Sequence, residues 1–265
     1  MNERKAVFFD VDGTLFKQGK NVPKSTIRAI AKIRENGHLA FVCTGRSRVM
    51  VPKTPILDIG FDGVVAACGM YADYQGKLLF AEEMRQEVLD DILPVLQRTE
   101  TMYILEGTEY IYYDENTIGN AIDDWYIDAI RTMIPGHFIP VPKDSCKIRA
   151  SKVSIQVPPQ RAHEVIEAAK KNFRVLLHYD NIGEIVPKGY TKASGIRRVC
   201  ELLGIDRADT IAVGDSINDV DMLQFAGCGI AMGNATEPAK EIADYVTTDI
   251  FEDGIWNAMA HMGLL

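Results

Sequence analysis

The sequence predicts an α/β fold, with a doubly wound, mainly parallel sheet into which an α+β domain is inserted. Near both ends of the chain, short apolar runs alternate with segments of helical periodicity, which is typical of a Rossmann-like sheet covered by helices on both faces. The middle of the chain differs, because strand-like segments there occur in pairs and are mixed with helices. The length of 265 residues, at about 150 residues per domain, allows one to two domains.

The first part of the chain is expected to contain three strands, a helix and a hairpin. Each strand is a continuous apolar run, the pattern of a strand buried on both faces. The helix lies between the first two strands, and Gly37 follows it as a stop. The pair Gln75-Gly76 is typical of a hairpin turn. We therefore expect strands at residues 6–9, 38–43 and 63–68, a hairpin at 71–80, and a helix at 23–36 that buries Ile27, Ile30, Ala31 and Ile33.

The C-terminal part repeats this alternation. A helix is expected at residues 191–203, where apolar residues recur at helical spacing and Gly204 follows as a stop. The apolar run at residues 210–214 predicts a buried strand that leads directly into Asp215. A further helix is expected after it, followed by strands at 228–232 and 244–247. The first of these helices has an apolar stripe of Ile196, Val199, Cys200 and Leu203, and the second has Val220, Leu223 and Ala226 at helical spacing.

The inserted α+β domain is expected over residues 84–186, and the core domain over residues 1–83 and 187–265. Paired strand-like segments and helices alternate within the insertion, with a turn at Glu106-Gly107. Its helices are expected at 83–97, 118–133 and 161–171, and its strands at 102–105, 109–113, 152–157 and, as a pair, within 173–187.

The charge balance and the cysteines restrict the possible functions. Asp and Glu number 37 against 29 Lys and Arg, a net charge of −8, and such an acidic chain is a poor candidate for binding nucleic acid or an anionic membrane. No segment approaches the roughly 18 continuous apolar residues of a membrane span, and the N-terminus lacks the apolar stretch of a signal peptide. The cysteines are odd in number and form no C-x-x-C pair, so we interpret them as reduced thiols and expect a cytoplasmic protein. They are Cys43, Cys68, Cys146, Cys200 and Cys228.

Two carboxylates follow the first predicted strand, in Asp10-Val11-Asp12-Gly13-Thr14. Residues i and i+2 of an extended segment point the same way, so both side chains are expected to converge at the C-terminal end of the strand, where open parallel sheets bind ligands. Adjacent carboxylates repel, so one keeps a proton or a cation lies between them. A calcium loop or a plain acidic turn is the alternative, but an EF-hand loop starting at Asp10 requires Gly and Glu where the chain has Leu15 and Asn21.

A second acidic segment, Gly214-Asp215-Ser216-Ile217-Asn218-Asp219, follows another predicted strand. Taken alone, Asn218 and Asp219 could serve as N-caps of the next helix. Taken with the first segment, Asp215 and Asp219 bring further carboxylates to the same sheet edge, and such a cluster requires a metal ion. Oxygen ligands without a nearby His or Cys favour Mg²⁺. The histidines are dispersed and fit no zinc spacing; they are His38, His137, His163, His178 and His261.

Two further segments are candidates for binding a phosphate group. Thr44-Gly45-Arg46 ends the second predicted strand, where a hydroxyl and the backbone N–H groups of a turn can hold phosphate oxygens. Lys192 begins the helix that follows the insertion. A lysine is slightly unfavourable at a helix N-terminus, whereas an anion there is stabilised by both the helix end and the ammonium group.

Four segments together resemble the ordered motifs of haloacid dehalogenase (HAD) superfamily phosphatases. They are Asp10-Val11-Asp12-Gly13-Thr14-Leu15, Thr44-Gly45-Arg46-Ser47, Lys192 and Gly214-Asp215-Ser216-Ile217-Asn218-Asp219. The stretch Pro187-Lys188-Gly189-Tyr190-Thr191-Lys192 and the length of the insertion resemble the Cof-type branch, which has a large α/β cap of the C2B type. The segment Cys68-Gly69-Met70 departs from that branch, which usually has Asn-Gly-Ala; this affects any substrate contact of the Asn amide, and not the chemistry.

The resemblance implies a phosphomonoesterase that acts on small phosphorylated metabolites, such as sugar phosphates, through an aspartyl-phosphate. Asp10 would be the nucleophile, and Asp12 would protonate the leaving alcohol and later deprotonate water. Mg²⁺ would be held by Asp10, the main-chain carbonyl of Asp12 and Asp215, with Asp219 ordering its waters. The phosphate would be bound by Thr44, the amides of Val11 and Gly45, Lys192 and Asn218.

The insertion is then expected to act as a lid that excludes water and selects the leaving group. It is rich in aromatic residues, which either pack its own core or face the substrate; they are Tyr103, Tyr110, Tyr112, Tyr113, Trp125 and Tyr126. The expected partner is a small-molecule phosphomonoester, and neither nucleic acid nor a membrane.

Other functions remain compatible with these motifs. A phosphomutase or phosphotransferase of the same fold would pass the phosphoryl group to a second hydroxyl instead of releasing phosphate. A receiver-like module would accept phosphate on Asp10 only as a signal, although an acid–base group such as Asp12 shortens the life of an acyl phosphate. An inactive scaffold or sensor is the third alternative, and the complete set of motifs argues against it.

Overall fold

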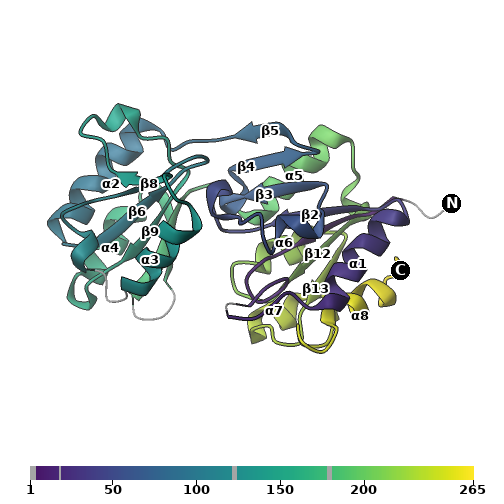
Figure 1. The fold of residues 1–265 in the computed structure, drawn as a ribbon. Coiled ribbons are helices and arrows are strands. Elements are labelled where there is room, and N and C mark those ends of the chain that lie inside the picture. The colour runs from purple at the N-terminus through teal and green to yellow at the C-terminus, as the bar shows by residue number, and fades with distance from the viewer. Residues whose placement is uncertain (1–3, 18, 121–123, 178–180) are drawn as a thin grey trace. The chain divides into compact units, whose positions relative to one another are not determined.

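The chain forms two compact units, each with its own sheet and hydrophobic core. The computed structural model describes residues 4–17, 19–120, 124–177 and 181–265 (Figure 1). The core unit comprises the described residues up to Arg46, Val51–Ala81 and Thr191–Leu265. The inserted unit comprises Glu82–Tyr190 together with the short segment Ser47–Met50. This architecture confirms the predicted α/β fold with a mainly parallel sheet and a second, mixed sheet.

The sheet of the core unit has eight strands in the order β14-β13-β12-β1-β2-β3-β4-β5. The first six strands in this order are parallel, and β4 and β5 are antiparallel to their neighbours. The central strands are buried along their whole length, which explains their continuous apolar runs. The strands are β1 Ala6–Phe9, β2 Leu39–Cys43, β3 Gly63–Ala66, β4 Tyr71–Tyr74, β5 Lys77–Ala81, β12 Thr210–Gly214, β13 Cys228–Ala231 and β14 Tyr245–Val246.

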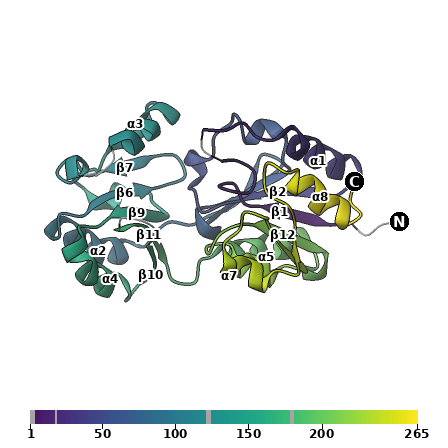
Figure 2. The ribbon, with the colours of Figure 1, turned by 90° about the horizontal axis from the view of Figure 1, so that it is seen from below.

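Helices cover both faces of this sheet. Figure 2 shows α1 and α8 on one face and α5 and α7 on the other. Helix α6 packs against α5 and α7. The helices are α1 Lys24–Glu35, α5 Lys192–Leu203, α6 Val220–Phe225, α7 Glu237–Ile242 and α8 Gly254–His261.

The buried side of α1 differs from the predicted one. The helix buries Thr26, Ala29, Ile30 and Ile33. The expectation that Ile27 and Ala31 are buried is wrong: both are exposed, Ile27 to 41%. The buried residues follow the i, i+3, i+4, i+7 spacing from Thr26, and this spacing leaves Ile27 and Ala31 at the solvent-facing margin.

The third strand of the core sheet is shorter than predicted. It ends at Ala66, because Ala67 and Cys68 have φ values of +50° and +51°, which no strand residue adopts. Gly69, with φ of +86°, completes a left-handed turn.

Helices α7 and α8 are absent from the sequence prediction, since they are only six and eight residues long.

The inserted unit has a six-stranded mixed sheet in the order β10-β11-β9-β6-β7-β8. All neighbouring strands are antiparallel except β7 and β8, which are parallel. The short strand β8 was not predicted from the sequence, which has a proline at its end. The strands are β6 Met102–Glu106, β7 Ile111–Tyr113, β8 Phe138–Pro140, β9 Lys152–Gln156, β10 Phe173–Leu177 and β11 Ile182–Pro187.

Each face of this second sheet has its own apolar cluster, since successive side chains of a strand point to opposite faces. Tyr103 and Leu105 of β6 pack with α2 Gln86–Arg98 and α4 Ala162–Ala169. Met102 and Ile104 pack on the other face with Ile127 and Ile130 of α3 Asp124–Met133 and with Ile134, which directly follows that helix. Met50 joins this second cluster, although it lies about fifty residues earlier in the chain. Residues 121–123 and 178–180, within the predicted helix and strand pair, lie outside the described residues.

The aromatic residues of the inserted unit are mostly core residues. Tyr103 and Tyr112 are buried among the apolar side chains next to α2 and α4, and Tyr110 packs against them partly buried. The ring of Tyr113 packs against that of Phe138, tilted by 30° and with the ring centroids 4.6 Å apart. The side chains of Trp125 and Tyr126 lie outside the described part of the structure. Among the helices that the structure describes, none combines the length and the apolar character that crossing a membrane requires.

Candidate active site

Three parallel strands end side by side and bring the predicted site residues to one edge of the core sheet. Strand β1 lies between β12 and β2, with Phe9 opposite Val213 on one side and Val42 on the other. Asp10 comes directly after Phe9, Asp215 comes two residues after Val213, and Thr44 comes two residues after Val42. Because parallel strands share their carboxyl-terminal edge, segments from distant parts of the sequence meet here.

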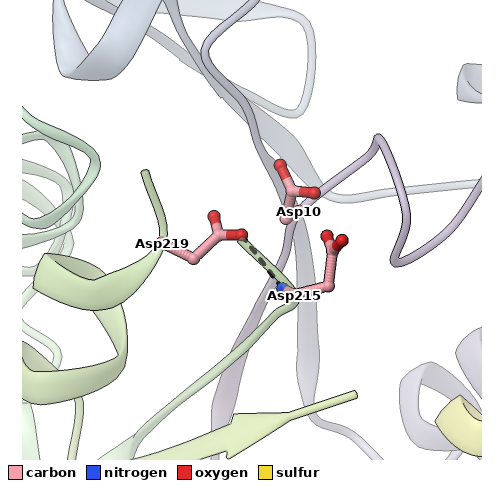
Figure 3. Close-up of side chains that lie close together, drawn as sticks. All are labelled: Asp10, Asp215 and Asp219. Atoms are coloured by element: carbon pink, nitrogen blue, oxygen red, sulfur yellow. Dashed lines mark hydrogen bonds between the residues drawn. The ribbon is translucent and has the colours of Figure 1, made fainter. Parts of the chain in front are cut away.

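Three carboxylates form a cluster at this edge. Asp10, Asp215 and Asp219 each offer one oxygen atom, and these oxygens lie within 4.8 Å of one another (Figure 3). Asp10 and Asp219 are buried, with 4% and 0% of their surface exposed, and Asp215 is partly buried. The structure thus brings together the two acidic segments on which the predicted metal site depends.

Asp219 is held by the loop that precedes it. Its Oδ2 accepts hydrogen bonds from the amides of Asp215 (3.0 Å, dashed in Figure 3) and Ser216 (2.9 Å). Gly214 is required beside it, since a Cβ there would lie 2.6 Å from the Cβ of Asp219. Asp219 occupies the N-cap position of α6, but in the described structure its side chain makes no capping hydrogen bond to that helix. Asp219 therefore lies at the helix start that the N-cap interpretation gives it, but its carboxylate organises the preceding loop instead of capping the helix. Asn218 accepts a hydrogen bond from the Ser216 hydroxyl at 2.6 Å.

Lys192 connects two members of the cluster. It is the first residue of α5, which is capped by reciprocal hydrogen bonds between Thr191 and Ser194. Its buried Nζ lies 2.6 Å from Asp10 Oδ1 and 2.5 Å from Asp219 Oδ1. Burial alone would lower the pKa of this ammonium, but the carboxylates of Asp10 and Asp219 raise it well above its usual value. Lys192 is therefore a permanent positive charge inside the cluster.

One ammonium does not balance three neighbouring carboxylates. Burial and the charge of Asp219 raise the pKa of Asp10 well above its usual value, although Lys192 opposes this. Burial and Asp219 likewise raise the pKa of Asp215 to about 7. Such shifts mark a site with an excess of negative charge that a further cation would relieve. Oxygen-only ligands fit a hard divalent ion, so the residues present fit the metal that the acidic segments predict.

The turn after β1 places the Asp12 carboxylate outside the three-carboxylate cluster, although its charge still acts on Asp10. The chain leaves strand geometry after Phe9, and the Gly13 amide donates to the Phe16 carbonyl at 2.7 Å. The Asp12 carboxylate therefore binds Arg46 instead of the three-carboxylate cluster, with Nε–Oδ2 and Nη2–Oδ1 distances of 2.7 and 2.6 Å. Gly13 has φ of +93°, and a Cβ there would overlap the Asp215 carboxylate.

The segment Thr44-Gly45-Arg46 forms a tight turn after β2. The buried Thr44 hydroxyl accepts a hydrogen bond from the Arg46 amide at 3.1 Å. The left-handed turn after β3 supports it from the next strand: Ala67 N–H donates to Arg46 O at 2.7 Å and Cys68 N–H to Thr44 O at 3.3 Å. The Cys68 thiol lies 4.0 Å from the Gly45 carbonyl oxygen, so its side chain packs against this turn.

Asn234 is a site residue that sequence reasoning missed. Its Nδ2 donates to the carbonyl of Gly13 at 2.8 Å, and its Oδ1 accepts from the Ile250 amide at 3.0 Å. It thereby ties the turn that contains Val11 and Asp12 to the segment after β14. Its place just after β13 is the available signal, because that strand ends at the same sheet edge as β12.

Comparisons with known proteins extend over almost the whole chain. The family model described as haloacid dehalogenase-like hydrolase matches residues 7–259. The Bacillus subtilis (strain 168) protein YkrA is 30% identical over 271 residues, covering 99% of each chain. The 5-amino-6-(5-phospho-D-ribitylamino)uracil phosphatase YitU of the same organism is 26% identical over 262 residues, covering 94% of each.

Solved structures are similar over the same extent. The sugar phosphatase BT4131, described as HAD subclass IIB, has a TM-score of 0.84 at 26% identity and covers 98% of this chain and 100% of its own. A hypothetical protein from Geobacillus kaustophilus HTA426 has a TM-score of 0.83 at 29% identity, covering 99% and 100%. Both units of the present chain are thus included in these similarities.

Proposed function

The chain belongs to the haloacid dehalogenase-like hydrolases and is a phosphatase of that family, and on this premise we propose that it hydrolyses small phosphomonoesters with Mg²⁺ through an aspartyl-phosphate. The observation that carries the proposal is the buried cluster in which Lys192 bridges Asp10 and Asp219 beside Asp215. Acidic groups from opposite ends of the sequence are buried together at considerable electrostatic cost, which is typical of a catalytic site.

The carboxylate cluster would hold the metal ion. Asp10, Asp215 and the main-chain carbonyl of Asp12 would be its protein ligands, and Asp219 would order its waters. When bound, Mg²⁺ would neutralise the negative charge that otherwise accumulates when a phosphate dianion enters this acidic site. The ammonium group of Lys192 supplies a second positive charge to the same site.

Asp10 would be the nucleophile. Its position is fixed by the amide hydrogen bond to the Val213 carbonyl (2.9 Å) and by the contact of Oδ1 with Lys192 (2.6 Å). A carboxylate oxygen of Asp10 would form a bond to phosphorus while the bond from phosphorus to the leaving alcohol oxygen breaks. Phosphate oxygens would be bound by the Thr44 hydroxyl, the amides of Val11 and Gly45, Lys192 and Asn218.

Asp12 would carry the protons. It would give a proton to the leaving alcohol in the first step and take one from water in the second, while that water attacks the aspartyl-phosphate and releases inorganic phosphate. The partly exposed position of Asp12 suits this exchange, because its carboxylate lies outside the buried cluster and close enough for its charge to act on Asp10.

We propose that the substrate is a phosphorylated sugar or sugar alcohol and that the inserted domain, residues 84–186, selects its leaving group. YitU and BT4131 are named for substrates whose phosphate is carried by a polyhydroxylated chain. The second sheet also contains a buried polar group: Lys152 lies 2.8 Å from Glu184 and 3.4 Å from Glu106. Glu106 shares its face with Ile104, opposite to the side chains that pack under α2 and α4.

The test is a phosphate-release screen over sugar, polyol, nucleotide and cofactor phosphates with Mg²⁺. Asp10→Asn, which keeps the size of the side chain and removes the nucleophilic carboxylate, should abolish turnover. Asp62→Asn is the matched control, since Asp62 pairs with Arg34 on a different part of the core unit. Turnover by Asp10→Asn would refute the aspartyl-phosphate, and transfer of the phosphoryl group to a second hydroxyl without net release would indicate a phosphomutase.

A further inference from the structure

We propose that Arg46 is a positioning residue that holds the carboxylate of Asp12 in the orientation required for proton transfer. The inference rests on the proposed acid–base function of Asp12. The guanidinium binds both carboxylate oxygens, with Nε–Oδ2 and Nη2–Oδ1 distances of 2.7 and 2.6 Å. Two parallel charge-assisted hydrogen bonds of this kind fix the plane of a carboxylate as well as its distance.

The backbone of Arg46 is held by hydrogen bonds at both its amide and its carbonyl. Its amide donates to the Thr44 hydroxyl at 3.1 Å, and its carbonyl accepts from the Ala67 amide at 2.7 Å. The side chain is mostly covered, with 23% of it exposed. The guanidinium is therefore presented from a backbone that the phosphate-binding turn and its neighbouring strand already hold in place.

Asp12 needs such a support more than the other acidic residues of the site. Its side chain is 54% exposed, whereas Asp10 and Asp219 are packed and bonded inside the cluster. An exposed aspartate rotates among several side-chain orientations, and a displacement of about 1 Å can cost about a hundredfold in rate. Because exposed ion pairs contribute little to stability, fixing the orientation of Asp12 is the effect that this pair can supply.

A second arginine–aspartate pair in the same unit provides a matched control. Arg34 binds Asp62 through the same two nitrogens, with Nε–Oδ2 and Nη2–Oδ1 distances of 3.1 and 3.0 Å. That pair joins α1 to the segment before β3 and is not among the residues assigned to the site. Removal of either guanidinium breaks the same kind of interaction, but only Arg46 contacts a group that takes part in the proposed reaction.

The experiment is a double-mutant cycle with Arg46→Met, Asp12→Ala and both together, and with Arg34→Met as control. The values of kcat and KM are measured with Mg²⁺ for p-nitrophenyl phosphate, whose leaving group needs no proton, and for glycerol 2-phosphate, whose leaving group does. We expect Arg46→Met to lower kcat/KM for glycerol 2-phosphate about 10- to 100-fold, to affect p-nitrophenyl phosphate less, and to cause no further loss in the Asp12→Ala background. Arg46→Lys, which forms one hydrogen bond instead of two, should recover part of the loss.

The outcomes separate this inference from the proposed function. An equal loss with and without Asp12, or a KM raised by the same factor for both substrates, would show that Arg46 acts on the phosphate directly and would overturn the inference alone. Wild-type rates in Arg46→Met and Arg46→Lys would also overturn it. Wild-type rates in Asp12→Ala would overturn the acid–base function of Asp12 and the inference with it. We also expect the Tm of each variant to equal that of the wild type, and the kcat of Arg34→Met to be unchanged.

Discussion

Replacement of Lys192 by methionine would leave the carboxylates of Asp10 and Asp219 buried without their shared ammonium. Methionine keeps the length and the apolar stem of the side chain, so the packing around it is largely preserved. Lys192 is 1% exposed and lies 2.6 Å and 2.5 Å from the two carboxylates. Removing one partner of a buried ion pair costs about 3–5 kcal/mol, because the remaining charge loses its compensation. For a domain of this size that loss corresponds to about 6–20 °C in Tm.

The assay is thermal unfolding of the metal-free protein, followed by circular dichroism, together with kcat for phosphate release. Lys171→Met is the control, since Lys171 also contacts a carboxylate at 2.6 Å, that of Asp91, but is 71% exposed. We expect no measurable change in Tm for that variant. A Tm for Lys192→Met equal to the wild-type value, or a shift as large in Lys171→Met, would refute the reasoning from burial.

Three further predictions concern other parts of the core unit. Gly13→Ala should abolish phosphatase activity, because φ of +93° is strained for alanine by about 1–3 kcal/mol and the new methyl group overlaps the Asp215 carboxylate; full activity in a kinetic assay would contradict this. Removal of Mg²⁺ by a chelator should abolish turnover, and added Mg²⁺ should restore it; activity in excess chelator would exclude the metal. Burial and the charge of Lys5 lower the pKa of His38, so the unfolded chain binds more protons at this residue than the folded chain does. The free energy of unfolding should therefore fall as the pH drops below about 6.5. In urea titrations at pH 7.5 and 5.5, His38→Gln should remove the contribution of His38 to this pH dependence.

The sheet of the core unit and the meeting of the two acidic segments at its edge were predictable from local sequence. Continuous apolar runs such as those of β1 and β12 indicate strands buried on both faces, and polar residues directly after them must reach the same sheet edge. This reasoning places Asp10 near Asp215, and the structure brings their carboxylates together. The same periodicity argument failed for Ile27, because hydrophobicity alone did not show which side of α1 faces the sheet.

The contacts that complete the site depend on turns, whose geometry the sequence does not display. The orientation of Asp12 follows from a turn that begins one residue after β1, so the alternation of a strand no longer applies to it. Cys68 adopts a left-handed conformation that is uncommon for residues other than glycine, and only the following Gly69 suggests a turn there. Asn234 contacts Gly13 across a separation of 221 residues; its place just after β13 indicates the sheet edge on which it lies, but not this partner.

The membership of Ser47–Met50 in the inserted unit affects how the protein can be re-engineered. The polypeptide passes between the units four times, and one of these passages follows immediately after Arg46. A chimaera that exchanged only residues 82–190 for those of a relative would separate Met50 from Met102, Ile104 and Ile111, with which it shares a cluster. Excision of residues 84–186 would likewise expose that methionine. Grafts of this part of the chain should therefore carry residues 47–50 along with it.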